Sequence, residues 1–144
     1  MAWDFSTEPE FQQTLGWIRD FVDREILPIE AISHELTQEQ LDRVTAPLKA
    51  EVKRRGLWAA HLGPEHGGPG MGQVKLALMH EILGRTIHAP EVFGNQAPDS
   101  GNAELLAVGA SEAQKERWLW PLLEGRLRSC FSMTEPHVAG SDPT

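Results

Sequence analysis

The last fourteen residues of the chain, FSMTEPHVAGSDPT (131–144), carry the groups that could bind a flat polar ring and a pyrophosphate. Thr134 offers a hydroxyl at the end of a short apolar segment, and Gly140 and Ser141 follow in a run of small residues. Small side chains let the backbone approach a ligand closely, and its N–H groups complement phosphate charge. An ordinary turn has the same composition, so composition alone leaves both interpretations open.

The histidines predict no metal site. His80 begins the pattern of a zinc protease, but the residue four positions later is Gly84 instead of a second histidine. His61 and His66 are five residues apart in a proline- and glycine-rich loop with no cysteine nearby, which favours solvated histidines over metal ligands. The sequence therefore predicts no metal ligands.

Three further features are weak candidates for a functional site. The glycine-rich run 67–72 resembles a phosphate-binding loop only in composition, because no predicted strand precedes it and no Gly-Lys-Ser/Thr follows. Cys130 has no paired histidine, so we expect a small buried apolar residue and not a nucleophile. Arg85 is four residues after Glu81 and is expected to form a surface ion pair with it. We predict no catalytic residue.

Size and charge restrict the class of protein. The 144 residues are expected to form a globular core, and the net charge of −8 argues against binding to nucleic acid. A single cysteine fits a reducing compartment, and no apolar run is long enough for a membrane span. The acidic N-terminus lacks the form of a signal peptide, so we expect a cytoplasmic protein of bacterial type.

Five helices are expected to position these groups. Capping boxes at Thr7/Glu10, Thr37/Gln40 and Ser111/Gln114 predict the starts of the first, second and fifth helices. The third and fourth are predicted near 73–84 and 100–108, with Val74, Leu78 and Ile82 on one face of the third. Leu41, Val44, Leu48 and Val52 form the predicted apolar face of the second.

Proline and glycine mark the expected helix ends. Pro28 should stop the first helix and Pro47 should kink or split the second, while Gly56 should cap it. RSCFSMT (128–134) is too short for a helix and suits a strand. The expected fold is mainly α: a helical bundle over 1–127, followed over 128–144 by the first strand of a second, β-domain.

The C-terminal motif resembles the flavin signature of the acyl-CoA dehydrogenase family. That signature has the form aromatic-x-apolar-Thr-Glu-Pro followed by Gly-Ser-Asp, and this chain has FSMTEP (131–136) and GSD (140–142). GLW followed by a Pro-Glu-x-Gly-Gly turn, and GASEAQKERWLWPLLEG, are also similar to the family. The segment after Thr-Glu-Pro is one residue longer than in most members. With QAPDSGN (96–102), it is similar to the branch related to dehydrogenases fused to a kinase-like domain.

The resemblance implies a flavoprotein of fatty acid metabolism that uses FAD to oxidise the α,β bond of an acyl-CoA. It places Thr134 on the flavin ring and Ser141 at the pyrophosphate or the CoA. The residues that it implies for cofactor binding are Phe131, Ser132, Met133, Thr134, Gly140 and Ser141. Those that it implies for substrate binding are Ser141, Phe93, Gln96, Ala97 and Gly101.

Family members are nearly three times longer and carry the catalytic glutamate in a C-terminal helical bundle. The resemblance therefore implies an N-terminal part that is inactive by itself. It also implies electron-transfer flavoprotein as the electron acceptor and a homodimer or homotetramer when the chain is full length. Two alternatives stay open: a non-catalytic helical interaction module derived from this domain, and a flavin oxidase or monooxygenase of the same fold.

Overall fold

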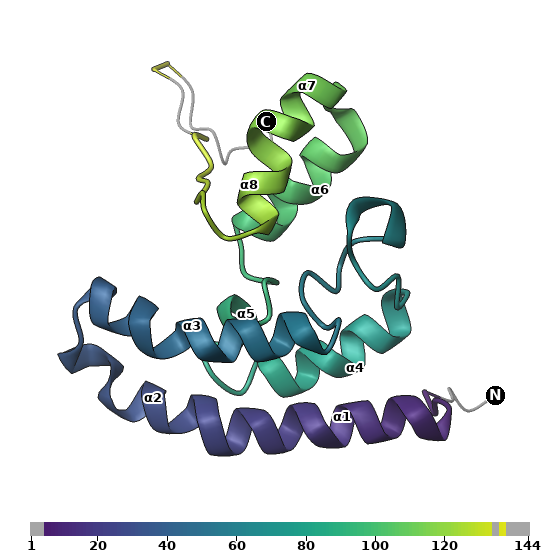
Figure 1. The fold of residues 1–144 in the computed structure, drawn as a ribbon, viewed down its shortest axis with the longest axis vertical. Helices are drawn as coiled ribbons and strands as arrows, with labels where there is room; N and C mark the ends of the chain where they lie inside the picture. The colour runs from purple at the N-terminus through teal and green to yellow at the C-terminus, as the bar shows by residue number, and fades with distance from the viewer. Residues whose placement is uncertain (1–4, 134–135, 138–144) are drawn as a thin grey trace. The chain divides into compact units, whose positions relative to one another are not determined.

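The computed structural model describes residues 5–133 and 136–137, and the regular structure within them is helical (Figure 1). The mainly α class is thereby confirmed. The strand expected over 128–134 is wrong as far as residues 128–133 are concerned, because they form neither helix nor strand. A strand needs the backbone groups of a neighbouring strand, and the described part of the chain offers none. Thr134 lies outside the described residues.

The chain divides into two compact units, Met1–Gln96 and Ala97–Thr144. The expected boundary after residue 127 remains a prediction. The helices of unit 1 are α1 Pro9–Phe21, a π-helical turn Val22–Ile26, α2 Leu27–Ile32, a 3-10 turn Ser33–Glu35, α3 Gln38–Arg54, a 3-10 turn Pro64–His66, α4 Gln73–Leu83 and α5 Ala89–Val92. Those of unit 2 are α6 Asp99–Gly109, α7 Glu112–Gln114, a π-helical turn Lys115–Leu119 and α8 Trp120–Leu123.

The core of unit 1 lies where α1 meets α4 and where α5 meets both α3 and α4. Phe11, Leu15 and Ile18 form the buried face of α1, and Val22 continues it in the π-helical turn; Ile18 and Val22 are fully inaccessible. Phe21 stacks on Trp17, with ring centroids 4.7 Å apart, and meets Phe93 of the α5 end edge to face at 6.1 Å. These aromatic contacts fix the end of α5 against the first helix.

The first helix begins later than expected. Glu8 caps α1 without a side-chain hydrogen bond, and the Thr7 hydroxyl accepts a hydrogen bond from Gln12 Nε2 at 2.6 Å. Pro9 stands in the first turn, where a missing N–H is not needed. The capping box predicted at Thr7 and Glu10 is therefore wrong.

Pro28 does not stop the helix. Leu27 N–H donates to Val22 O, five residues back, so the π-helical turn widens the backbone just before the proline. Pro28 then falls in the first turn of α2. The same arrangement occurs before Pro121, where Trp120 N–H donates to Lys115 O. In both places the wider turn lets the helix pass a proline that would otherwise clash with the carbonyl four residues earlier.

The second and fifth predicted helices begin as expected. Thr37 and Gln40 form both hydrogen bonds of a capping box at the start of α3, and Ser111 and Gln114 do so at α7. Gly56 follows α3 with a φ of 68°, which confirms the predicted glycine cap. Pro47 lies inside α3 without splitting it.

The faces of α3 and α4 differ in part from expectation. Val44 and Val74 are 40% and 50% exposed, whereas Thr45 and Met79 are buried. Thr45 satisfies its hydroxyl by donating to Leu41 O at 3.0 Å, which allows a polar residue to take an inward position. None of the described helices combines the length and the apolar character that a bilayer crossing needs.

Candidate cofactor and substrate site

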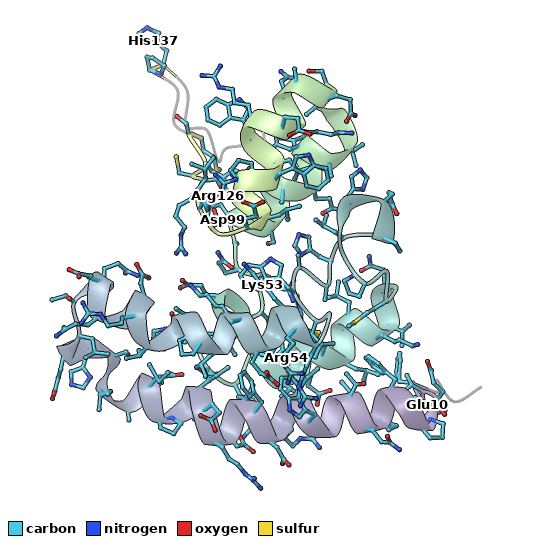
Figure 2. All side chains as sticks on the ribbon, viewed as in Figure 1. Glu10, Lys53, Arg54, Asp99, Arg126 and His137 are labelled. Carbon is cyan, nitrogen blue, oxygen red and sulfur yellow. The ribbon has the colours of Figure 1, made fainter. Side chains whose placement is uncertain are left out.

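The segment that leads into the flavin-like motif is attached to the start of α6. Asp99 Oδ1 accepts hydrogen bonds from the Ser129 N–H at 2.7 Å and from the Ser129 hydroxyl at 2.6 Å. Asn102, one turn along α6, donates from Nδ2 to the same hydroxyl at 2.9 Å. Arg128 Nε lies 3.5 Å from the second oxygen of Asp99. Figure 2 shows Asp99 beside the segment that follows α8. This tether fixes where residues 130–133 leave the helical unit.

The Asp99 carboxylate is well suited to this role. Its side chain is only 14% exposed, and hydrogen bonds to an ionised acceptor are about twice as strong as neutral ones. Asp99 is also the first residue of α6, where a negative charge complements the helix dipole. The tether thus joins residues that are 30 positions apart in the sequence.

The tether brings one predicted substrate residue next to one predicted cofactor residue. A Cβ atom built on Gly101 would lie 3.9 Å from Phe131 Cζ, so these two residues are neighbours in unit 2. Phe131 and Met133 are 62% and 58% exposed, and Ser132 is exposed between them. No backbone hydrogen bond joins residues 130–133 to another residue that the structure describes.

The described part of the motif, residues 131–133, leaves its side chains exposed. Its large apolar side chains, Phe131 and Met133, are exposed, as contact with a flat ring requires. Thr134, Gly140 and Ser141, which complete the predicted cofactor set, lie outside the described residues. Their assignment stays a prediction.

A groove of about 300 Å³ lies next to this segment in unit 2. Leu105, Leu106, Trp118 and Leu122 supply most of its apolar wall, and Cys130 lies at the same groove. Cys130 is exposed, so its expected burial is wrong. Leu105 on α6 and Trp118 in the turn before α8 are 70% and 45% exposed, so they are open to a ligand or to another part of a protein.

The remaining predicted substrate residues are distributed over both units. Phe93 is fully buried in the core of unit 1, and Gln96 at the end of that unit is half-buried. Ala97 is exposed at the start of unit 2. Nothing in these positions tests a role in substrate binding, and the assignment stays a prediction.

Three contacts hold the segment 93–95 against the loop after α3, here called the 58–61 loop. Ala59 N–H donates to Phe93 O at 3.0 Å, and the His61 ring, through Nδ1, is 2.9 Å from Asn95 Oδ1. The Trp58 indole packs so closely on Gly94 that a Cβ there would lie 2.6 Å from Trp58 Cε2.

The Trp58 ring also meets α3, because Lys53 Nζ lies 4.3 Å from its centroid. Figure 2 marks Lys53 near the end of that helix. Lys49 Nζ, one turn earlier on α3, forms an ion pair with Glu91 of α5 at 2.8 Å. The segment 93–95 is thus held by the 58–61 loop, and α5, which precedes it, is held by the ion pair with α3.

The loop histidines differ from each other. His61 is not the solvated residue expected, because it is half-buried and bonded to Asn95. His66 lies 3.4 Å from Glu65 in the 3-10 turn. Partial burial, together with the charge of nearby His61, lowers the pKa of His80 below its ordinary value, although the residue as a whole is exposed.

Arg85 pairs with Asp23 at 2.7 Å, so its predicted pairing with Glu81 is wrong. The described residues contain no group of three or more His, Cys, Asp or Glu side chains placed to hold a metal ion.

Sequence reasoning missed the residues that position these segments. Asp99, Asn102 and Ser129 are ordinary polar residues in the sequence, and the only local signal was the Pro-Asp-Ser start of α6. His61 and Asn95 are 34 residues apart, and no spacing rule connects them. Such pairings depend on how the elements pack.

Comparison with known proteins identifies the fold and the family together. Residues 8–126 match the family model for the N-terminal domain of acyl-CoA dehydrogenases. Mouse acyl-CoA dehydrogenase family member 10 is 42% identical over 146 residues, an alignment that covers 93% of this chain and 13% of the mouse protein. Human family member 11 is 40% identical over 141 residues, covering 92% of this chain and 18% of the human protein.

A solved structure from Mycobacterium abscessus, assigned to the acyl-CoA dehydrogenases, has the same fold. The TM-score is 0.82 at 37% identity, and the alignment covers 95% of this chain and 37% of that one. This chain thus spans a minor part of the length of each relative. The match over residues 8–126 shows that the chain belongs to the acyl-CoA dehydrogenase family, in the region of its N-terminal domain.

Proposed function

We propose that this chain is the N-terminal part of an FAD-dependent acyl-CoA dehydrogenase that oxidises the α,β bond of an acyl-CoA to the trans-2-enoyl-CoA. The family match over residues 8–126 supports this proposal most strongly. The proximity of Gly101 and Phe131 supports it further, because the proposed substrate and cofactor residues are then neighbours in unit 2.

The proposed cofactor residues are those of the C-terminal motif. Phe131, Ser132 and Met133 would lie along the flavin ring, with Thr134 donating a hydrogen bond to it. Gly140 and Ser141 would offer backbone N–H groups to the pyrophosphate. FAD, when bound, supplies a hydride acceptor. The protein's own contribution is to orient the ring through the Asp99–Ser129 tether, which fixes where the motif begins.

The substrate would be held by Ser141 and by the region of Phe93, Gln96, Ala97 and Gly101. Because Phe93 is buried, its contribution would be the shape of the backbone around it and not a side-chain contact. Within unit 2, the exposed side chain of Leu105 at the groove suits an acyl chain. Electron-transfer flavoprotein is the proposed electron acceptor, and a homodimer or homotetramer the proposed assembly of the longer protein.

We propose no catalytic base among these 144 residues. Several of the described carboxylates are already engaged: Glu51 with Arg54 and Arg55, Glu91 with Lys49, and Asp99 with Ser129. Abstraction of the α-proton needs a positioned carboxylate. The relatives are several times longer than this chain, so the base would lie in the remaining part of such a protein.

The test compares the longer protein that carries this chain with the 144 residues alone. Each is incubated with acyl-CoA and an artificial electron acceptor, and the CoA products are identified by mass spectrometry. We expect trans-2-enoyl-CoA from the longer protein and none from the 144 residues. Turnover by the 144 residues would contradict the assignment of the base. Product formation with release of hydrogen peroxide would instead favour an oxidase.

A non-catalytic interaction module is the second candidate. The exposed apolar side chains of unit 2 favour it, because Leu105 and Val108 are 70% and 82% exposed on α6. This candidate predicts that the protein carrying the chain binds no FAD and forms no enoyl-CoA.

A further inference from the structure

The 58–61 loop meets the segment 93–95 through three contacts of different kinds. Ala59 and Phe93 share a backbone hydrogen bond, Trp58 packs on Gly94, and His61 bonds Asn95. Each of the three consecutive residues 93–95 thus has a contact with the 58–61 loop within unit 1. The residue that follows, Gln96, is one of the proposed substrate residues.

The conformation of this loop is strained and is imposed by its surroundings. Ala59 has a φ of 52°, in the left-handed region that residues with a Cβ seldom occupy. Ala59 is 2% exposed, and its N–H is the one that bonds Phe93 O. Strain of this kind persists only where several contacts determine it, and it is concentrated at functional sites.

The His61–Asn95 pair is polar at a partly buried position where an apolar pair would cost less free energy on folding. Asn95 is 8% exposed, and its Nδ2 and the His61 Nε2 are both buried without a hydrogen-bond partner among the described residues. Buried polar atoms without partners disfavour folding, so stability alone does not explain the pair. A hydrogen bond adds direction: with Asn95 Oδ1 as acceptor, His61 Nδ1 donates and the Asn95 side chain is held in one orientation.

We propose that His61 is a positioning residue for substrate selection, acting through Asn95 on the adjoining Gln96. His61 holds the Asn95 side chain, the Ala59 N–H bonds the Phe93 carbonyl, and the Trp58 ring packs on Gly94. With the three preceding residues held in this way, Gln96 is presented in one place. This inference rests on the proposed function, in which Gln96 helps to hold the substrate. The expected consequence is discrimination between short and long acyl chains.

The experiment uses the longer protein that carries this chain, loaded with FAD, and two single variants. The amide nitrogen of Asn occupies the position of His Nδ1, so His61→Asn keeps the donor to Asn95. The amide nitrogen of Gln occupies the position of Nε2, so His61→Gln removes it. Binding of S-butyl-CoA and S-dodecyl-CoA, which lack the thioester carbonyl, is measured by calorimetry. Steady-state kcat and KM for the matching acyl-CoA thioesters are measured in parallel.

We expect His61→Gln to change the ratio of the two Kd values by about tenfold, with kcat changed much less. His61→Asn should restore the wild-type ratio. His66→Gln, five residues later in the 3-10 turn and paired with Glu65, is the matched control and should leave the ratio unchanged.

Equal ratios in wild type, His61→Gln and His61→Asn would overturn the inference, and so would a loss of affinity that is the same for both chain lengths. If His61→Gln does not fold, Asn95→Asp, which keeps the acceptor and the size of the side chain, must show the wild-type ratio. Failure of the wild type to bind either thioether would overturn the proposed function itself, which separates that outcome from failure of the inference alone.

Discussion

Asp99 and Ser129 are joined twice, because one carboxylate oxygen of Asp99 accepts hydrogen bonds from both the backbone N–H and the hydroxyl of Ser129. The pair connects the first residue of α6 to the segment that leads into the Thr-Glu-Pro motif. It therefore determines where the proposed flavin-binding residues begin.

Asp99→Ala should release the segment after α8. The Ser129 N–H would lose its acceptor, and a hydrogen bond to a charged group of this kind stabilises by about 1–3 kcal/mol. Hydrogen exchange of the Ser129 amide should therefore become roughly 10 to 100 times faster. Glu104→Ala, which changes an exposed residue of the same helix, is the control. An unchanged exchange rate at Ser129 would show that the tether does not hold the segment.

Gly94→Ala and Gly16→Ala should have opposite effects on stability. At Gly94, where φ is 68°, an added Cβ would lie 2.6 Å from Trp58 Cε2, and we expect a loss of about 1–3 kcal/mol in the free energy of unfolding. Gly16 lies inside α1 with no neighbouring atom within 4 Å of such a Cβ, and the helix should gain about 0.5–1 kcal/mol. Urea unfolding measures both. Stabilisation by Gly94→Ala would contradict the packing of Trp58 on this segment.

His80 should make the protein less stable in mild acid. Burial and the nearby His61 lower the pKa of His80 in the folded state, so the unfolded state takes up the proton first, near pH 6.5. The contribution of His80 to stability is complete above that pH and declines as the pH falls through the lower folded-state pKa. His80→Gln should flatten this part of the curve of unfolding free energy against pH. His34→Gln is the control for the loss of an exposed histidine, and an identical curve for His80→Gln and wild type would contradict this account.

Thr134→Val tests the proposed hydrogen bond to the flavin in the longer protein. Valine keeps the shape of threonine but leaves a ring atom without its donor, at a cost of about 1–3 kcal/mol. The reduced ring gains negative charge, so the loss should fall more on reduction than on binding. We expect near-normal flavin content, a lower reduction potential and slower reduction by substrate. Ser132→Ala should change little, whereas wild-type potential and rate in Thr134→Val would show that the hydroxyl does not bond the ring.

The sequence predicted the helical class and the elements whose start is encoded locally. Thr37 with Gln40, and Ser111 with Gln114, form capping boxes because each depends on residues only three positions apart. The prediction that Pro28 stops the first helix is wrong, because a π-helical turn before the proline relieves the clash between its ring and the backbone. The strand expected over 128–134 depends on partner strands, which local sequence cannot supply.

The sequence allowed us to predict which residues belong to the candidate site, but not the contacts that hold them in place. The Thr-Glu-Pro motif identified the family, and the match over 8–126 confirms that family. The contacts that position the site join Asp99 to Ser129 and His61 to Asn95, across 30 and 34 residues. Such contacts arise from packing between distant elements, and neither periodicity nor spacing along the chain indicates them.

The proposed activity is tested most directly by the visible absorbance of the protein that carries this chain, measured without oxygen while acyl-CoA is added. The account predicts that the protein purifies with FAD and that one equivalent of a suitable acyl-CoA bleaches the flavin absorbance, with one equivalent of trans-2-enoyl-CoA formed. A flavin absorbance that stays unchanged with acyl-CoA substrates of short, medium and long chains, or a protein that binds no flavin, would contradict it.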